Sequence, residues 1–269
     1  MAIPPPLPNA TLQARDLADL RQAKLLLENP GLAVRLANLV GTPIEKGFKL
    51  LPKGWTEAVH SAARRALMRA VDVAVASLSK RPRFIASDKF HKILVGASGG
   101  LGGAFGLASL PIELPVSTTF MLRSIADIAR SEGHDLRSAS VKLACLEVFA
   151  LGGRSKSDDA SESGYWAIRA ALAKAISEAA AYMAERGAVE HSAPAVVRLI
   201  TAIAARFGVI VSEQVAAKAV PVIGAASGSI INILFMDHFQ DMARGHFIVK
   251  RLEARYGVGK IRDAYEQLT

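Results

Sequence analysis

The sequence predicts an all-α protein, a multi-helix bundle with glycine-rich, closely packed central helices. Two stripes of apolar residues recur at spacings of three and four, a helix-start pattern lies near residue 42, and strand-like alternation is weak throughout. Of the 269 residues, 51% are apolar but only 6% are aromatic, and small residues, chiefly alanine and glycine, are abundant. Small side chains let helix axes approach each other closely.

The first eleven residues are expected to form a disordered, proline-rich tail. The stretch MAIPPPLPNA favours polyproline II, and it has neither the basic nor the apolar region of a secretory signal. Over residues 12–269 we expect one helical domain, with possible halves at 42–150 and 165–257. The single cysteine, Cys145, forms no internal disulfide, which fits a reducing compartment and a cytoplasmic location.

Helix boundaries are indicated at two places. The stretch TPIEKGFKLL puts Thr42 at the N-cap, Pro43 at the first helical position and Glu45 three residues after the cap, which is a capping box. Further along, Gly133 and Asp135 indicate where one helix ends and the next begins.

Two charge-free runs, residues 93–112 and 219–236, reach the length of a membrane span. The first holds six glycines between positions 96 and 106, and the second contains Pro221. Because glycine adds almost no transfer energy, we favour buried helices packed closely through glycine. Peripheral insertion and true spans are the alternatives.

Glu113 is the only charged residue between Lys92 and Arg123, and it lies between Pro111 and Pro115. Because proline has no N–H, these prolines predict two helices that meet at a kink, with Glu113 in the joint. Two interpretations stay open. One is a buried carboxylate that caps a helix or pairs with arginine, and the other is a ligand-binding or general-base carboxylate.

Residues 151–166 predict a loop of small and charged residues between the possible halves. The pentapeptides ADIAR at 126–130 and QDMAR at 240–244 indicate a possible internal pseudo-repeat. Beyond the loop, two apolar stripes predict amphipathic helices with one buried face. The first comprises Tyr165, Ile168, Leu172, Ile176, Ala179 and Met183, and the second comprises Val196, Leu199, Ile203, Phe207 and Ile210.

Charged residues interrupt several of the apolar helices. Buried charges are costly unless they are paired, so we expect them to form a buried polar network or to line a ligand site. In particular, Arg123 is predicted to pair with Asp237, Asp127 or Glu113. The candidate residues are Glu113, Arg123, Asp127, Arg130, Glu147, Asp237, His238, Asp241 and Arg244.

Known catalytic patterns do not fit the sequence. His238 and Asp241 have a spacing found in carboxylate-bridged metal sites, but a second such motif is missing, so no metal and no cofactor is expected. Neither a G-x-S-x-G elbow nor a Walker A loop occurs, and Cys145 is interpreted as a small core residue. The catalytic residues, and whether the chain is an enzyme at all, stay open.

Three stretches carry a resemblance to a known family. SLPIELPVSTTFMLRSIADIARSEG, CLEVFALGG and VPVIGAASGSIINILFMDHFQDMARGHFIVKRLEARYG together resemble the bacterial EcsC family, over about residues 42–257. The family is named after a gene beside an ABC transporter. The resemblance therefore implies a bacterial, helical, cytoplasmic or membrane-associated protein and no particular catalytic residues.

The net charge of +9 favours anionic partners. With few aromatic residues and no long basic run, nucleic acid is disfavoured. Three functions stay open. We favour a membrane-associated accessory or interaction protein, peripheral at the inner face of the membrane, whose partner is an anionic membrane surface or a membrane protein. The alternatives are a hydrolase-like enzyme using Glu113, His238 and Asp241, and a purely structural helical scaffold.

Overall fold

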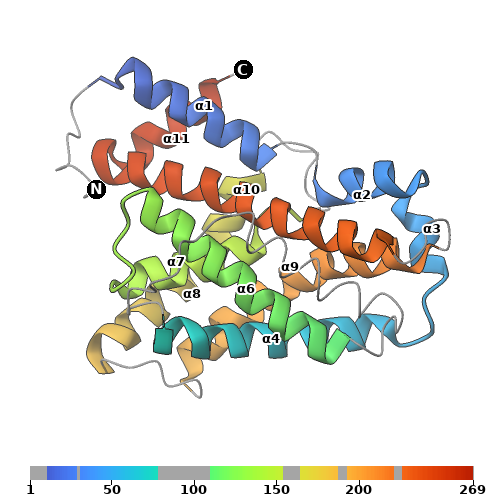
Figure 1. Ribbon diagram of the computed structural model, residues 1–269. Helices are drawn as coiled ribbons and strands as arrows, with labels where there is room; N and C mark the ends of the chain where they lie inside the picture. Colours follow the sequence, from blue (N-terminus) through green and yellow to red (C-terminus); the bar gives the residue numbers. More distant parts are fainter. Residues whose placement is uncertain are drawn as a thin grey trace.

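The computed structural model describes residues 11–28, 31–77, 110–153, 164–186, 193–220 and 226–268. Within these ranges the chain forms ten α-helices and one short 3-10 helix, with no strand (Figure 1). The predicted all-α class is therefore confirmed. The proline-rich tail before Thr11, the glycine run at 96–106 and the middle of the predicted loop at 151–166 lie outside the described residues.

The described helices differ widely in length. In chain order they are α1 (Ala14–Glu28), α2 (Leu32–Val40), α3 (Ile44–Lys49), α4 (Trp55–Ser77), α6 (Leu110–Ser131), α7 (Ala139–Glu147), the 3-10 helix η2 (Val148–Ala150), α8 (Gly164–Arg186), α9 (Pro194–Ala219), α10 (Ala226–Tyr256) and α11 (Val258–Gln267).

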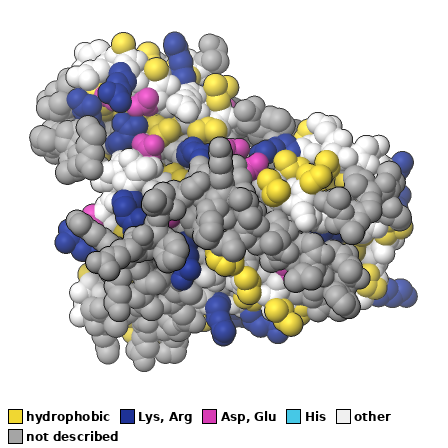
Figure 2. All heavy atoms as spheres, viewed as in Figure 1, with side chains coloured by type: hydrophobic (Ala, Val, Ile, Leu, Met, Phe, Trp, Pro, Cys, Tyr) yellow, Lys and Arg dark blue, Asp and Glu magenta, His cyan; other side chains and the backbone are white. Residues whose placement is uncertain are grey.

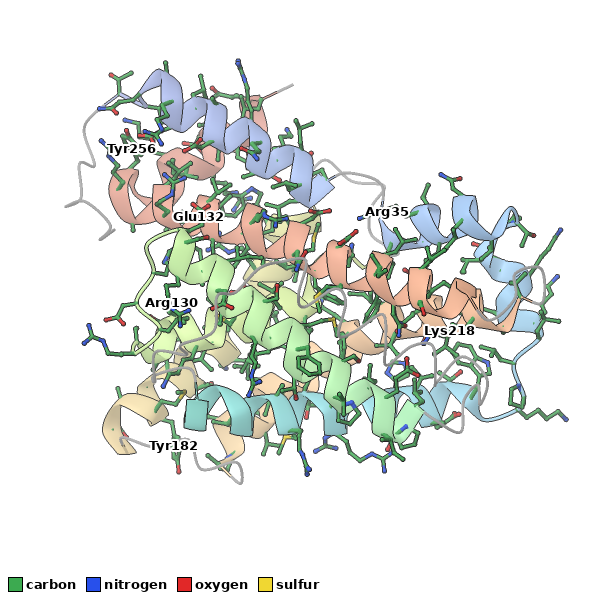
Figure 3. The ribbon with its side chains drawn as sticks, viewed as in Figure 1. Arg35, Arg130, Glu132, Tyr182, Lys218 and Tyr256 are labelled. Atoms are coloured by element: carbon green, nitrogen blue, oxygen red, sulfur yellow. The ribbon has the colours of Figure 1, made fainter. Side chains whose placement is uncertain are left out.

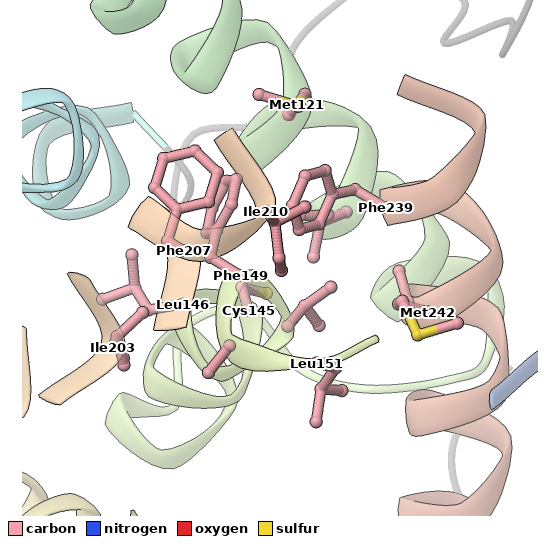
Figure 4. Close-up of a cluster of buried hydrophobic side chains, with 14 of the residues drawn as sticks. Met121, Cys145, Leu146, Phe149, Leu151, Ile203, Phe207, Ile210, Phe239 and Met242 are labelled. Atoms are coloured by element: carbon pink, nitrogen blue, oxygen red, sulfur yellow. The ribbon is translucent and has the colours of Figure 1, made fainter. Parts of the chain in front are cut away.

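Two long helices organise the bundle. Helix α9 packs against α2, α3, α4 and α8, whereas α10 packs against α1, α6 and α11. Between them lies a group of aromatic rings. The centroid of Phe149 is 5.1 Å from that of Phe207 and 5.3 Å from that of Phe239 (Figure 4). Because Phe149 lies on η2, this short turn between α7 and α8 anchors the centre of the core.

The two apolar stripes lie on the predicted helices. Tyr165, Leu172 and Ala179 of α8 are buried, and every member of the α9 stripe from Val196 to Ile210 is buried. Of the described helices, α9 alone is long and apolar enough to cross a membrane, but 56% of its most apolar 18-residue window is covered by the rest of the protein. Core helices of soluble proteins pass the same length test, so this finding is weak evidence for a span.

The predicted helix boundaries need two corrections. Helix α3 begins at Ile44 with Pro43 at its N-cap, and the Thr42 hydroxyl has no hydrogen-bond partner, so the capping box does not form. Gly133 does follow the end of α6, with a φ of +88° that suits glycine. The next helix, however, begins at Ala139 after Ser138 rather than near Asp135.

The predicted joint between two helices at Glu113 is also wrong. Helix α6 runs without interruption from Leu110, so Glu113 lies in its first turn and Pro115 lies inside it. Pro111 is the second residue of the helix, where the N–H would have no helical partner in any case. Only the bond from residue 115 to the Pro111 carbonyl is lost, and one missing bond near a helix end is tolerated.

Helices α6 and α10, which carry the two similar pentapeptides, pack against each other. The Gln240 side chain donates to the Ser124 hydroxyl at 2.8 Å and joins the two helices in the core. The structural equivalence of the two segments stays a prediction.

Candidate functional site

The predicted site residues do not meet in one place; the described structure distributes them over separate polar groups. Figure 3 illustrates the separation through Arg35, Arg130 and Lys218, which lie in different parts of the bundle.

The first group joins α6, α9 and α10 around Glu113. Its Oε1 accepts from Lys218 Nζ at 2.8 Å and from Asn232 Nδ2 at 3.0 Å. Gln214 Nε2 donates to Asn232 Oδ1 at 2.7 Å and extends the group inward. The Glu113 and Lys218 side chains are only 10% and 16% exposed, so this is a largely buried ion pair. The interpretation of Glu113 as a paired structural carboxylate is therefore supported, with lysine rather than arginine as its partner.

The second group lies between α7, α8 and α10 and contains Glu147. His246 Nε2 is 3.5 Å from Glu147 Oε2, and the other ring nitrogen is 3.1 Å from the Tyr165 hydroxyl. Burial raises the pKa of Glu147 and lowers the pKa of His246, so both groups favour their neutral forms. Arg169 and Glu253 close the group with two hydrogen bonds of 2.6 and 3.0 Å.

The third group connects α2 to α10. Arg35 lies 3.4 Å from Asp241 and 3.9 Å from Asp237, and Arg244 lies 3.5 Å from Asp241. His238 is buried beside it, and burial, helped by the charge of Arg35, lowers the pKa of its ring to about 4. An uncharged histidine packed this way is a core residue.

The predicted pairing of Arg123 with a buried acid is wrong. Arg123 is exposed, and the three acids expected to pair with it contact other cations. Glu113 contacts Lys218, Asp237 contacts Arg35, and Asp127 contacts Arg130 at 2.6 Å. The last pair is a surface contact between residues three apart on α6 and contributes little to stability.

The residues of the hydrolase alternative are held apart. Glu113 bonds to Asn232, which lies nine residues before Asp241 on α10, a distance of roughly 13 Å along a helix. Among the described residues, no group of three or more His, Cys, Asp or Glu side chains is placed to hold a metal ion. Burial raises the pKa of Cys145 to about 12, so this thiol is not a nucleophile at neutral pH.

Several members of these groups were not found by sequence reasoning. They are Arg35, Tyr165 as a polar residue, Arg169, Gln214, Lys218, Asn232, His246 and Glu253. Lys218 carried a usable signal, because it is the one basic residue in the last turn of a largely apolar helix of 26 residues. Arg35 carried none, since nothing in its neighbourhood distinguishes it from a solvated surface arginine.

A surface groove between α4 and α6 is the other candidate site. Its volume is about 910 Å³, and its described lining joins three arginines to an apolar wall. Ile112 is 76% and Val116 44% exposed, and the three arginines are also exposed. The lining residues are Ser61, Arg64, Arg65, Met68, Arg69, Pro111, Ile112, Pro115, Val116 and Thr119.

The charge of this α4–α6 groove is unbalanced. No acid occurs among its described lining residues, and within the described part of the chain no ion pair involves Arg64, Arg65 or Arg69. In Figure 2, Lys or Arg side chains lie next to hydrophobic ones along the lower edge of the molecule, where Figure 1 places α4. A second groove of about 480 Å³, between α2 and α3, has Glu45 as the only charged residue in its described lining.

The fold and these groups define a class of protein, an all-α bundle whose described helices are joined by buried polar groups and ion pairs. Within that class, the EcsC protein family matches residues 15–252, and the chain belongs to this family. No curated protein and no solved structure matches the chain.

Proposed function

We propose that this protein is a membrane-associated accessory protein that binds an anionic lipid surface through the α4–α6 groove. The observation that carries the proposal is the set of three exposed arginines, without acids among the described lining, beside the exposed Ile112 and Val116. Most other arginines of the described helices, such as Arg169, Arg251 and Arg255, have a carboxylate partner.

Cations beside apolar side chains suit a lipid interface. A basic residue near an anionic membrane contributes about 1 kcal/mol of binding energy. Apolar side chains add to this when they enter the boundary between headgroups and acyl chains. Three arginines would together contribute about 3 kcal/mol, which corresponds to roughly a 100-fold change in affinity.

Vesicle co-sedimentation tests the proposal. The protein should bind vesicles of phosphatidylcholine with phosphatidylglycerol and should not bind vesicles of phosphatidylcholine alone. Raising the salt from about 0.1 M to about 1 M shortens the Debye length from about 10 Å to about 3 Å and should release the bound protein. Replacement of Arg64, Arg65 and Arg69 by Gln should weaken binding roughly 100-fold.

A matched control variant separates the groove from net charge. Arg15, Arg21 and Lys174 are exposed and lie on α1 and α8, away from the groove lining. Their replacement by Gln lowers the net charge by the same three units and should cost much less binding. Equal losses in the two triple variants would show that net charge and not the groove drives association. If neither vesicle binds the native protein, the membrane proposal is wrong.

That last outcome would favour the scaffold alternative, because the buried ion pairs would then serve packing alone. The hydrolase alternative receives no support from the described residues, since Glu113 is paired with Lys218 and lies far from Asp241.

A further inference from the structure

The α4–α6 groove presents three arginines beside an apolar wall. Arg65 and Arg69 are four residues apart on α4, so they lie on the same helix face with about 5–6 Å between their Cβ atoms. Arg64 adds a third guanidinium to the same groove. A guanidinium presents a planar fork of N–H donors that fits two phosphate oxygens at once.

The charge of the groove exceeds that of a common phosphodiester headgroup. Three guanidinium groups face the groove, and no acid among the described lining residues offsets them. A phosphodiester carries one negative charge, whereas a phosphomonoester carries about −1.5 to −2 at pH 7 and has three strong acceptor oxygens. The phosphomonoester is therefore the better match in both charge and number of acceptors.

The opposite wall fits an acyl chain or a glycerol backbone. Pro111, Ile112, Pro115 and Val116 of the first turns of α6 line this wall, and Met68 of α4 is the other apolar residue of the described lining. Ile112 and Val116 are four residues apart and are both exposed, so they form a continuous apolar strip. A ligand that is dianionic at one end and apolar at the other satisfies both walls.

We propose that the α4–α6 groove binds a single phospholipid with a phosphomonoester headgroup, of the phosphatidic acid class. The phosphate lies between Arg65 and Arg69 with Arg64 beside it, and the acyl part lies along Ile112 and Val116. This inference rests on the proposed function, since the lipid is presented to the groove by a membrane.

The test compares headgroups at equal surface charge. Vesicles of phosphatidylcholine receive either phosphatidic acid or enough phosphatidylglycerol to give the same zeta potential, and the dissociation constant is measured for each. The native protein should prefer phosphatidic acid by about tenfold or more. Equal affinity for the two vesicles overturns the inference but leaves the proposed function standing, whereas binding to neither overturns the proposed function itself.

Two variants and one competitor sharpen the result. The double variant Arg65→Lys with Arg69→Lys keeps both positive charges but removes the planar guanidinium groups that can bind two phosphate oxygens at once. Binding to phosphatidylglycerol should therefore persist, while the preference for phosphatidic acid should disappear. Arg15→Lys with Arg21→Lys is the matched control on α1 and should keep the preference. Soluble glycerol 3-phosphate should compete only weakly. If glycerol 3-phosphate binds as tightly as the lipid, the proposed contact with the acyl part is wrong. If the preference for phosphatidic acid survives the Arg65 and Arg69 changes, the proposed phosphate site is wrong.

Discussion

At the scale of single residues, the ion pair between Glu113 and Lys218 shows how a charge is accommodated in an apolar interior. Both side chains are largely buried, and the carboxylate also accepts from Asn232. Removing one partner of such a pair leaves an uncompensated buried charge, whereas replacing both with apolar groups is often neutral.

The first prediction follows from this pair. Lys218→Met should lower the free energy of unfolding by on the order of 3 kcal/mol, measured by urea denaturation. The double variant Lys218→Met with Glu113→Leu should recover most of that loss. A single variant as stable as the native protein would mean that the carboxylate is solvated or neutral and that the pair does not stabilise the fold.

The second prediction concerns His238. Burial lowers the pKa of its ring from 6.5 to about 4, so between these values the unfolded chain binds a proton that the folded chain does not. Folding stability contributed by this group is therefore present above pH 6.5 and is lost as the pH falls towards 4. The total loss is about 3 kcal/mol, since one unit of pKa corresponds to about 1.4 kcal/mol.

The matched variant isolates this contribution from other titrating groups. His238→Gln cannot take up the proton, so its stability should fall less steeply with decreasing pH, by up to about 1.4 kcal/mol per pH unit. Chemical denaturation at several pH values between 4 and 7 measures both slopes. Burial also lowers the pKa of His134 and of His246, so these residues add to the pH dependence of the native protein. The contribution of His238 is therefore measured by the difference in slope between the native protein and the His238→Gln variant. Parallel slopes would show that His238 titrates normally.

At the scale of helices, α1 approaches α10 closely at a glycine of α10. A Cβ atom on Gly245 of α10 would lie 2.6 Å from Leu27 Cγ and 3.0 Å from the Ala23 carbonyl oxygen of α1. The same two helices are joined by Arg251 to Asp19 at 2.9 Å and by Arg255 to Asp16 at 3.0 Å. The missing side chain of Gly245 thus lets α1 and α10 pack closely, and the two ion pairs add polar contacts between the same helices.

The third prediction is that Gly245→Ala destabilises the protein by about 1–3 kcal/mol, because the methyl group forces α1 and α10 apart. Gly259→Ala on α11 is the control, since its Cβ would meet nothing within 4 Å. That change should be neutral or stabilise by up to about 1 kcal/mol through helix propensity. Thermal melts of the two variants give the comparison, and a Gly245→Ala protein that melts like the control would refute the close-contact explanation.

Periodicity along the sequence predicted the helices well but not their ends or partners. The stripes of α8 and α9 depend on local spacing, which is why Tyr165 and Phe207 were assigned to buried faces. The predicted break between two helices at Glu113 was wrong because prolines in the first turns of a helix are compatible with it. Partners such as Arg35 and Lys218 come from distant segments, and neither spacing nor composition indicates which cation meets which acid.

At the scale of the whole molecule, three exposed arginines of the described helices, Arg64, Arg65 and Arg69, lie together in one groove. The net charge of +9 alone predicted an anionic partner but could not locate its site. The location that we propose depends on α4 and α6 lying side by side, which brings Arg65 and Arg69 to the same groove as Ile112 across a segment of more than forty residues. Such a site is a product of the tertiary fold and leaves no contiguous motif.

The contact between α1 and α10 also has a consequence during protein synthesis. Asp19 and its partner Arg251 are separated by 232 positions, and Asp16 and Arg255 by 239. At about 5–20 residues per second, the ribosome needs roughly 10–50 s to complete the interval between them. For that time α1 lacks α10, the helix against which it packs in the folded protein. The nascent chain therefore presents the uncovered face of α1 to molecular chaperones until α10 emerges.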